Sequence, residues 1–155
     1  GIVFRHYSLP ASERRALFNR VRATAPRRRH LLLLAGPDWQ ARAWGADGSH
    51  GRMRGRGLHS APVHCLREIR AAERPGAAFL FLSPLHATRS HPGAEPLGPK
   101  RFAELARKTR LPVIALGGMD MEKARALPVL GAYGWAGIDA WAQSPGRQKR
   151  KAVPT

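Results

Sequence analysis

The sequence predicts an α/β fold with a parallel sheet, and within that class a (β/α)8 barrel. Short apolar segments of strand length alternate along the chain with segments whose apolar residues recur at helical spacing. Each strand and the helix after it take about 20–30 residues, a short and regular repeat that is typical of such barrels. Several strand candidates are apolar throughout, as strands covered on both faces usually are.

The first two predicted strands flank one predicted helix. Residues 2–4 read Ile-Val-Phe, a short buried strand, and the continuous leucines of 31–34 predict a second strand. Between them, Ser12 can cap a helix that carries Leu17 and Val21 on one face. This part of the chain therefore follows the order strand, helix, strand.

A shorter helix and a weaker strand come next. Asp38 can cap a helix that ends near Gly45, and residues 58–63 form a weak strand candidate. Leu66 and Ile69 then predict a helix that turns both side chains toward the core.

The second half of the chain repeats the alternation. Its strand candidates are short, apolar and bounded by proline or glycine, which makes their ends easy to place. The predicted elements are a strand at 79–82, a long loop to Pro99, a helix carrying Phe102, Leu105 and Ala106, a strand at 113–116, a helix capped by Asp120 and reaching about Leu127, and a last strand at 135–140.

The number of strands decides the domain organisation. The chain offers roughly six or seven strand candidates and a closed barrel needs eight, so we expect the first N-terminal strand-helix unit to be missing from this chain. Residues 1–142 are predicted to form one barrel domain, and the basic tail at 143–155 is predicted to be disordered. An open sheet stays an alternative, although no Gly-x-Gly-x-x-Gly dinucleotide fingerprint follows the first strand.

Charge narrows the classes of partner. The chain of 155 residues has 27 Lys and Arg against 10 Asp and Glu, a formal net charge of +17. A field of that sign attracts anions, which include phosphorylated metabolites, nucleic acid and acidic lipid. No RNA-binding aromatic signature or helix-turn-helix pattern accompanies the arginines. Specific nucleic-acid binding is therefore not favoured, whereas nonspecific binding of polyanions is expected.

Cysteine content and apolar patterning exclude further classes. Cys65 is the single cysteine, which rules out a disulfide framework within the chain, and we expect it to be a small buried residue. No apolar run approaches the ~20 residues of a membrane span, and no signal peptide is visible. These features predict a cytoplasmic protein without a membrane partner.

Chemistry in a parallel (β/α) fold is expected where the strands end. One such loop holds Ser83, Thr88 and Ser90, whose hydroxyl and backbone N–H groups can cradle a phosphate, unless it is simply a hydrophilic loop. Another holds Gly117 and Gly118 just before a helix. Their N–H groups can approach an anion, or the two glycines can serve only a tight turn.

A third group of candidates lies after Gly45. Asp47 is more typical of a turn residue than of a metal ligand, and His50 is the better candidate for an inward-facing side chain. A purely structural role stays an alternative for His50. The other histidines show no metal-ligand spacing, and the chain has neither a His-Glu-x-x-His motif nor a Gly-x-Ser-x-Gly nucleophile elbow.

Three motifs stand in a fixed order along the chain. They are Gly45-Ala46-Asp47-Gly48-x-His50, then Ser83-Pro84-x-x-x-Thr88-x-Ser90-His91-Pro92-Gly93, and then Pro112-Val113-Ile114-Ala115-Leu116-Gly117-Gly118-Met119. In residue type, order and spacing they resemble the motifs of the thiamine phosphate synthase/TenI family, over roughly residues 1–141.

The resemblance implies a (β/α)8 barrel with a function in thiamine biosynthesis. Synthases of this family are transferases that condense hydroxymethylpyrimidine diphosphate with thiazole phosphate and release pyrophosphate, with Mg²⁺. TenI-type members bind or isomerise a phosphorylated small molecule instead. A divergent synthase, a non-synthase barrel and a basic nucleic-acid-binding module are thus the three functions left open, in that order. Family barrels commonly dimerise, so a homodimer is compatible with the resemblance.

The resemblance also implies roles for individual residues. The positions implied to bind the phosphorylated substrate are Arg5, Thr88, Ser90, His91, Gly117 and Gly118. The positions implied to line the site are His50, His64, Ser83 and Asp139. Arg5 matches the arginine that contacts pyrophosphate, whereas His91 stands where synthases have a lysine.

The chain departs from the family where Mg²⁺ binds. Synthases have Asn-Asp at the strand end that here reads Ala35-Gly36, and their second Mg²⁺ aspartate falls in 51–57, which here holds three arginines. Asp139 replaces a serine beside the thiazole phosphate. Mg²⁺ needs hard oxygen ligands, usually carboxylates. It is therefore a cofactor that the resemblance implies, but no residue of this chain is predicted as its ligand.

Overall fold

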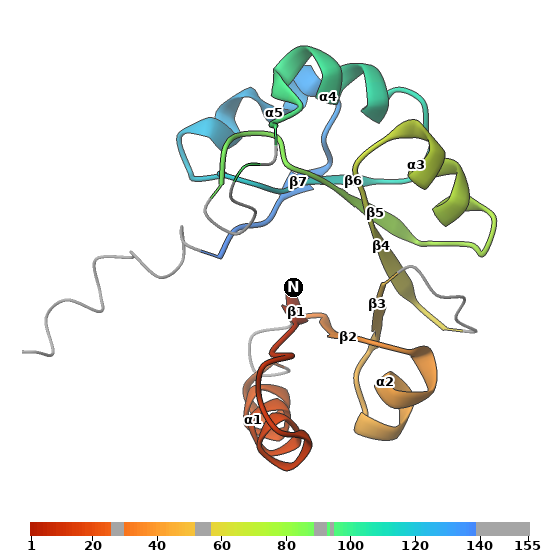
Figure 1. Ribbon diagram of the computed structural model, residues 1–155, viewed down its shortest axis with the longest axis vertical. Helices are drawn as coiled ribbons and strands as arrows, with labels where there is room; N and C mark the ends of the chain where they lie inside the picture. The colour runs from red at the N-terminus through yellow and green to blue at the C-terminus, as the bar shows by residue number, and fades with distance from the viewer. Residues whose placement is uncertain (26–29, 52–56, 89–92, 94, 139–155) are drawn as a thin grey trace, which may run out of the picture. The chain divides into compact units, whose positions relative to one another are not determined.

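The computed structural model describes residues 1–25, 30–51, 57–88, 93 and 95–138. Strands and helices alternate through this part of the chain, except that β4 follows β3 directly among the described elements, as Figure 1 shows. The strands are β1 Ile2–Phe4, β2 Leu32–Ala35, β3 Gly48–His50, β4 His59–Val63, β5 Phe79–Leu82, β6 Val113–Ala115 and β7 Gly134–Trp135. The helices are α1 Ala11–Thr24, α2 Asp38–Trp44, α3 Leu66–Glu73, α4 Gly98–Ala106 and α5 Leu127–Leu130, with a 3₁₀ turn, η2, at Lys123–Ala126.

The strands follow one another in the sheet in chain order, from β1 to β7. β1 to β4 pair in parallel, with Phe4 beside Leu34 and Ala35 beside His50, and β6 pairs in parallel with β7. A doubly wound open sheet reverses its strand order at a switch point, whereas a (β/α) barrel keeps the chain order. The predicted α/β class with barrel-type winding is therefore confirmed, and the open-sheet alternative is wrong.

Contacts divide the chain into two compact units, a first unit at Gly1–Phe81 and a second unit at Leu82–Thr155. The core of the first unit lies between its first strands and helices, since α1 and α2 cover the same face of β1 and β2 in Figure 1. Its buried members are Phe4, Phe18, Ala25, Leu32, Leu34 and Ala41. Leu17 and Val21 pack against this core from α1, as their spacing predicts.

The second unit buries the apolar face of α4 together with strand and loop residues. Its buried apolar side chains are Leu82, Leu85, Phe102, Ala103, Ala106, Val113, Ala115, Met119 and Leu127. Pro99 occupies the first turn of α4, where a missing N–H costs no helical hydrogen bond. α4 and α5 contact each other within this unit.

Two predicted helix caps are wrong for the same reason. α1 begins at Ala11 and α2 at Asp38, so that Pro10 and Pro37 hold the N-cap positions and neither helix has a side-chain cap. Both prolines are extended, with ψ of 151° and 148°, and a helix can start at the next residue. Ser12 therefore lies inside α1. Asp38 lies in the first turn of α2, where its carboxylate pairs with Arg42.

The structure also corrects one strand and two side chains. β3 was not predicted as a strand, because Gly48-Ser49-His50 contains no apolar residue, although all three are buried. Leu66 is 40% exposed because it begins α3 and has no helical turn before it, whereas Ile69 is buried as predicted. Cys65 is the N-cap of α3 and is only partly buried.

The last elements are shorter than their patterns predict. After Asp120 the chain forms the 3₁₀ turn η2 and then the four residues of α5, which end at Leu130 with Gly131 in the left-handed conformation. β7 covers two residues, and the remainder of the strand predicted at 135–140 reaches positions outside the described residues. Among the described residues no helix is both long and apolar enough to cross a membrane.

Candidate functional site

The first unit places a polar pair at the carboxyl end of β3. His50 is the last residue of β3 and Ser60 the second residue of β4, and the two are register partners. The Nδ1 atom of His50 lies 2.9 Å from the hydroxyl oxygen of Ser60. The ring of Phe81 meets the His50 ring edge to face, at 5.1 Å between centroids. His50 is thus a buried side chain held by a hydroxyl and an aromatic ring.

The environment of His50 keeps its imidazole neutral at physiological pH. Burial is the larger cause and the nearby positive charge of Arg5 the smaller, and together they lower the pKa of His50 from 6.5 to about 4. Arg5 follows β1 directly and its side chain is exposed. A neutral ring next to a guanidinium can exchange hydrogen bonds with a ligand without adding charge of its own.

Two other candidates of the first unit have structural partners. The Asp47 carboxylate accepts a 2.7 Å hydrogen bond from the N–H of Leu32 at the amino end of β2. Asp47 is therefore a turn residue, as the sequence suggested, at the end of the sheet opposite the candidate site. His64 precedes α3, and both its backbone N–H and its Nδ1 atom contact the carboxylate of Glu68, at 2.7 and 2.8 Å.

In the second unit, the loop after β5 and the loop after β6 are tied together by backbone hydrogen bonds. The N–H of Leu85 donates to the carbonyl of Leu116 at 2.8 Å, and that of His86 donates to the carbonyl of Gly117 at 3.1 Å. The N–H of Leu116 returns a bond to the carbonyl of Leu82. This brings the buried Ser83 and the half-buried Thr88 onto the loop that faces the glycine pair.

The close approach of these loops explains why both positions are glycine. A Cβ atom on Gly117 would lie 2.7 Å from the Cβ of Pro84, and one on Gly118 would lie 2.4 Å from the carbonyl oxygen of Ala87. Both glycines also have positive φ, at 97° and 60°. Within the described residues their N–H groups donate to no backbone or side-chain acceptor.

A short polar network flanks the glycine pair. The Nζ atom of Lys123 donates to the carbonyl of Gly118 at 2.9 Å and to the carboxylate of Asp120 at 2.6 Å. Asp120 also accepts a hydrogen bond from the backbone N–H of Lys123, and these two bonds lower the pKa of its carboxyl. Burial first, and then the charge of Lys123, lower the pKa of His86.

The structure groups the predicted site residues into two sets. Arg5 and His50 belong together in the first unit, and the second set lies in the second unit at Ser83, Thr88, Gly117 and Gly118. His64 instead contacts Glu68 on the helix that follows it, α3. Ser90, His91 and Asp139 lie outside the described residues. Ser60 and Lys123 were not predicted as site residues, although their positions, on a strand and after a glycine turn, offered a signal.

The residues at the end of β2 do not fit the magnesium that the resemblance implies. Ala35 and Gly36 carry no side-chain oxygen, and the carbonyl of Ala35 accepts a 2.8 Å hydrogen bond from the guanidinium of Arg14. Asp38, the nearest carboxylate in sequence, pairs with Arg42. The described residues contain no group of three or more His, Cys, Asp and Glu side chains that could hold a metal ion. A guanidinium therefore stands where a hard cation would need carboxylates.

Comparison with known proteins gives consistent results. The family model described as thiamine monophosphate synthase matches residues 60–141, just over half of the chain. A protein of Aquifex aeolicus, provisionally named thiamine-phosphate synthase 2, is 46% identical over 76 residues, which are 49% of this chain and 41% of that protein. The thiamine biosynthesis bifunctional protein ThiM/ThiE of Symbiobacterium thermophilum is 31% identical over 162 residues, 93% of this chain and 33% of that protein.

A solved structure agrees with the fold. Thiamine phosphate pyrophosphorylase from Pyrococcus furiosus superposes with a TM-score of 0.79 at 22% identity, and the match covers 96% of this chain and 77% of that one. At this identity the likeness establishes the (β/α)-barrel fold and no more. The chain spans less than half the length of the two relatives named above.

Proposed function

Because the chain belongs to the thiamine monophosphate synthase/TenI family, we propose that it is a synthase-like transferase of thiamine biosynthesis. It joins hydroxymethylpyrimidine diphosphate to thiazole phosphate. The bond between the pyrimidine methylene carbon and the diphosphate oxygen breaks, pyrophosphate leaves with the electron pair, and the thiazole nitrogen bonds to the same carbon. The protein then has to bind two phosphorylated molecules and stabilise a planar cation.

The glycine pair after β6 is the observation that carries this proposal. Gly117 and Gly118 present two backbone N–H groups that are unused among the described residues, in a loop held rigidly by hydrogen bonds to the loop after β5. Successive N–H groups of this kind bind phosphate oxygens without needing a metal. Thiazole phosphate is the ligand we assign to this loop.

The first unit contributes the groups assigned to the diphosphate side. Arg5 offers an exposed guanidinium, whose planar set of donors suits phosphate oxygens. His50, neutral and held by Ser60, adds a hydrogen-bonding group beside it without adding charge. These residues bind and orient the diphosphate, and the positive charge formed when pyrophosphate leaves is delocalised over the pyrimidine ring.

A condensation assay tests the proposal. The full chain is mixed with hydroxymethylpyrimidine diphosphate and thiazole phosphate, with added Mg²⁺ or with a chelator, and thiamine phosphate and pyrophosphate are measured together. We expect both products in equal amounts. Gly118→Ala should reduce the amount of product because it weakens binding of the thiazole phosphate. Gly98→Ala, at a glycine with open space around it, should not reduce it. Absence of product from protein shown to be folded would contradict the proposal.

The end of β2 favours a second candidate, a non-synthase barrel of the TenI type. Ala35 and Gly36 stand where a synthase has a metal-binding aspartate, so the reaction can have been lost while phosphate binding stays. This candidate predicts saturable binding of thiazole phosphate with no condensation. Titration of the folded chain with thiazole phosphate alone separates it from the first proposal when it is read beside the condensation assay.

A further inference from the structure

Most of the described carboxylates of the first unit are bound to a partner within that unit. Asp38 pairs with Arg42, Asp47 binds the amino end of β2, Glu68 binds His64 and Glu73 pairs with Arg70. The fifth, Glu13, is exposed in the first turn of α1. The sequence from Gly48 to Arg67 contains no Asp or Glu at all. This part of the sheet therefore lacks the oxygen ligands that a divalent cation requires.

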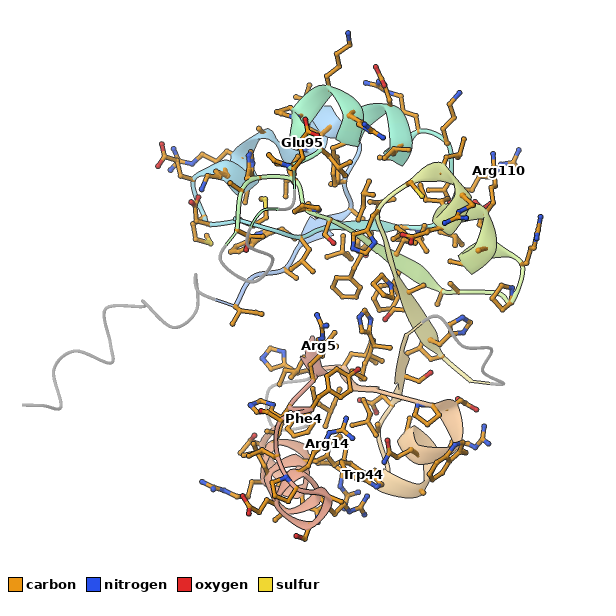
Figure 2. All side chains as sticks on the ribbon, viewed as in Figure 1. Phe4, Arg5, Arg14, Trp44, Glu95 and Arg110 are labelled. Atoms are coloured by element: carbon orange, nitrogen blue, oxygen red, sulfur yellow. The ribbon has the colours of Figure 1, made fainter. Side chains whose placement is uncertain are left out.

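Arg14 fixes a guanidinium at the end of β2. Its Nη2 atom donates to the carbonyl oxygen of Ala35 at 2.8 Å, and its Nε atom is buried with no hydrogen-bond partner. The guanidinium carbon also lies 5.2 Å from the ring centroids of both Tyr7 and Trp44. Figure 2 shows Arg14 and Trp44 between α1 and α2. The aromatic rings hold the cation in place, and no ion pair joins Arg14 to a described carboxylate.

Arg5 adds a second guanidinium at the same edge. Phe4 is the register partner of Leu34, so Arg5 is next to Ala35, the residue that Arg14 binds. Arg5 is exposed and forms no ion pair with any described residue. Its charge contributes to the lowered pKa of His50, which places it near the end of β3 as well.

We propose that the carboxyl ends of β1 and β2 bind the diphosphate group of the substrate without a metal ion. Arg5 contacts the diphosphate oxygens, and Arg14 is a positioning residue that holds the Ala35 strand end and supplies a fixed positive charge. The two guanidinium groups take the role of the divalent cation in neutralising the anion. This inference rests on the proposed function, since it concerns the diphosphate end of the same site.

Titration with inorganic pyrophosphate tests the inference on the full chain. Binding is measured calorimetrically at about 0.15 M NaCl, where exposed charges more than ~8 Å apart are largely screened. One series contains EDTA and the other contains excess MgCl₂. We expect saturable one-to-one binding in EDTA, and Mg²⁺ should not tighten it, because the site offers the ion no ligands.

Arg14→Gln and Arg15→Gln form a matched pair of variants. Arg15 lies beside Arg14 on α1, donates to the carbonyl of Ala43 and packs on Trp44, so it shares the helix and the chemistry but contacts α2 and no strand end. Arg14→Gln should weaken pyrophosphate binding about tenfold, with Arg15→Gln within about twofold of the original chain. Arg14→Lys keeps the charge and should recover part of the loss, which a purely structural role would not require.

The outcomes are separable. Pyrophosphate binding that requires Mg²⁺ overturns the inference and leaves the proposed function standing, because the diphosphate is then held through a metal. An equal loss in Arg14→Gln and Arg15→Gln also overturns it, since that points to general charge. Failure to bind in both EDTA and Mg²⁺ overturns the inference and the proposed function together. If Arg14→Gln does not fold, the inference is still tested by pyrophosphate binding to Arg14→Lys and by the comparison of EDTA with Mg²⁺ on the original chain.

Discussion

At the scale of single residues, Gly117 and Gly118 have two separate reasons to be glycine. One is positive φ, and the other is the contact with Pro84 and Ala87 across the loop junction. A side chain at Gly118 would meet a backbone carbonyl oxygen, which cannot move aside as the end of a flexible side chain can. The local backbone conformation and the proposed ligand binding thus both require glycine at these positions.

Gly118→Ala should be more destabilising than a glycine substitution that meets only the φ penalty. We expect the free energy of unfolding to fall by about 2–4 kcal/mol, from the left-handed conformation and the displaced backbone together. Gly98→Ala is the control, because Gly98 has φ of 68° but no atom within 4 Å of the new Cβ, and should cost about 1 kcal/mol. Urea unfolding of the three proteins measures the difference, and equal losses would contradict the role of the contact.

His50 is the residue whose ionisation should shape stability against pH. Its folded-state pKa of about 4 lies below the ordinary 6.5, so the unfolded chain takes up a proton first as the pH falls. Stability should therefore drop between about pH 6.5 and 4, by up to about 3 kcal/mol from this residue, and then level off. Above pH 6.5 the residue contributes no pH dependence.

His50→Gln isolates this contribution. Its unfolding free energy, measured by urea denaturation from pH 4 to pH 8, should lack the part of the slope that His50 supplies, so the two curves should approach each other toward low pH. Gln keeps a side-chain amide for Ser60, which limits the loss of packing and hydrogen bonding. Curves that stay parallel across the whole range would show that His50 does not stay neutral in the folded chain.

At the scale of elements, α3 depends on a contact made just before its start. Glu68, in the first turn, accepts hydrogen bonds from the backbone and ring of His64, and this pairing joins the end of β4 to the helix. An acceptor at this position satisfies an N–H group that the helix itself cannot. His64 therefore has a structural use whatever its part in ligand binding.

Glu68→Ala should weaken this junction. We expect a loss of about 1 kcal/mol, because a part-buried N–H loses its acceptor. Glu73→Ala removes a carboxylate from the last turn of the same helix, where Glu73 pairs with the more exposed Arg70, and should change stability by about 0.5 kcal/mol or less. Thermal unfolding of both variants measures the two losses of stability. A larger loss in Glu73→Ala than in Glu68→Ala would contradict the role given to Glu68.

At the scale of the whole molecule, the net charge of +17 shapes how the chain meets other anions. Charge of this kind attracts polyanions over a distance without selecting among them. The remaining alternative from the sequence, a basic nucleic-acid-binding module, differs from a phosphate-binding barrel in how its binding responds to salt and to competing ligands.

Duplex DNA should bind the chain weakly and without sequence preference. Raising NaCl from about 50 to 200 mM should abolish most of the binding, since nonspecific affinity comes from released counterions. Fluorescence anisotropy with two unrelated duplexes measures this. Pyrophosphate, which we assign to a built site, should lose far less affinity over the same range. Salt-resistant, sequence-dependent binding of one duplex would instead support a nucleic-acid function.

The sequence by itself was sufficient for the fold class and for the order of most elements. Continuous apolar runs such as 31–34 and 79–82 are visible because burial on both faces demands apolar residues along the whole strand. β3 was not predicted because Gly48, Ser49 and His50 are not apolar, and they are buried only because neighbouring elements cover them. The first residues of α1 and α2 were predicted wrongly because a proline and a residue that can cap a helix stand within one turn of each other, and the helix begins directly after the proline.

For the site, the sequence predicts the glycine pair, the loop that faces it, Arg5 and His50 as binding positions, and these assignments stay predictions. Only the tertiary structure brought His50 to Ser60, Gly118 to Ala87 and Arg14 to Ala35. Those partners are ten or more residues apart in the chain in all three pairs. Residue type and spacing indicate which chemistry a side chain can perform. Contacts between residues so far apart in the chain depend on strand register and helix packing, which exist only in the folded chain.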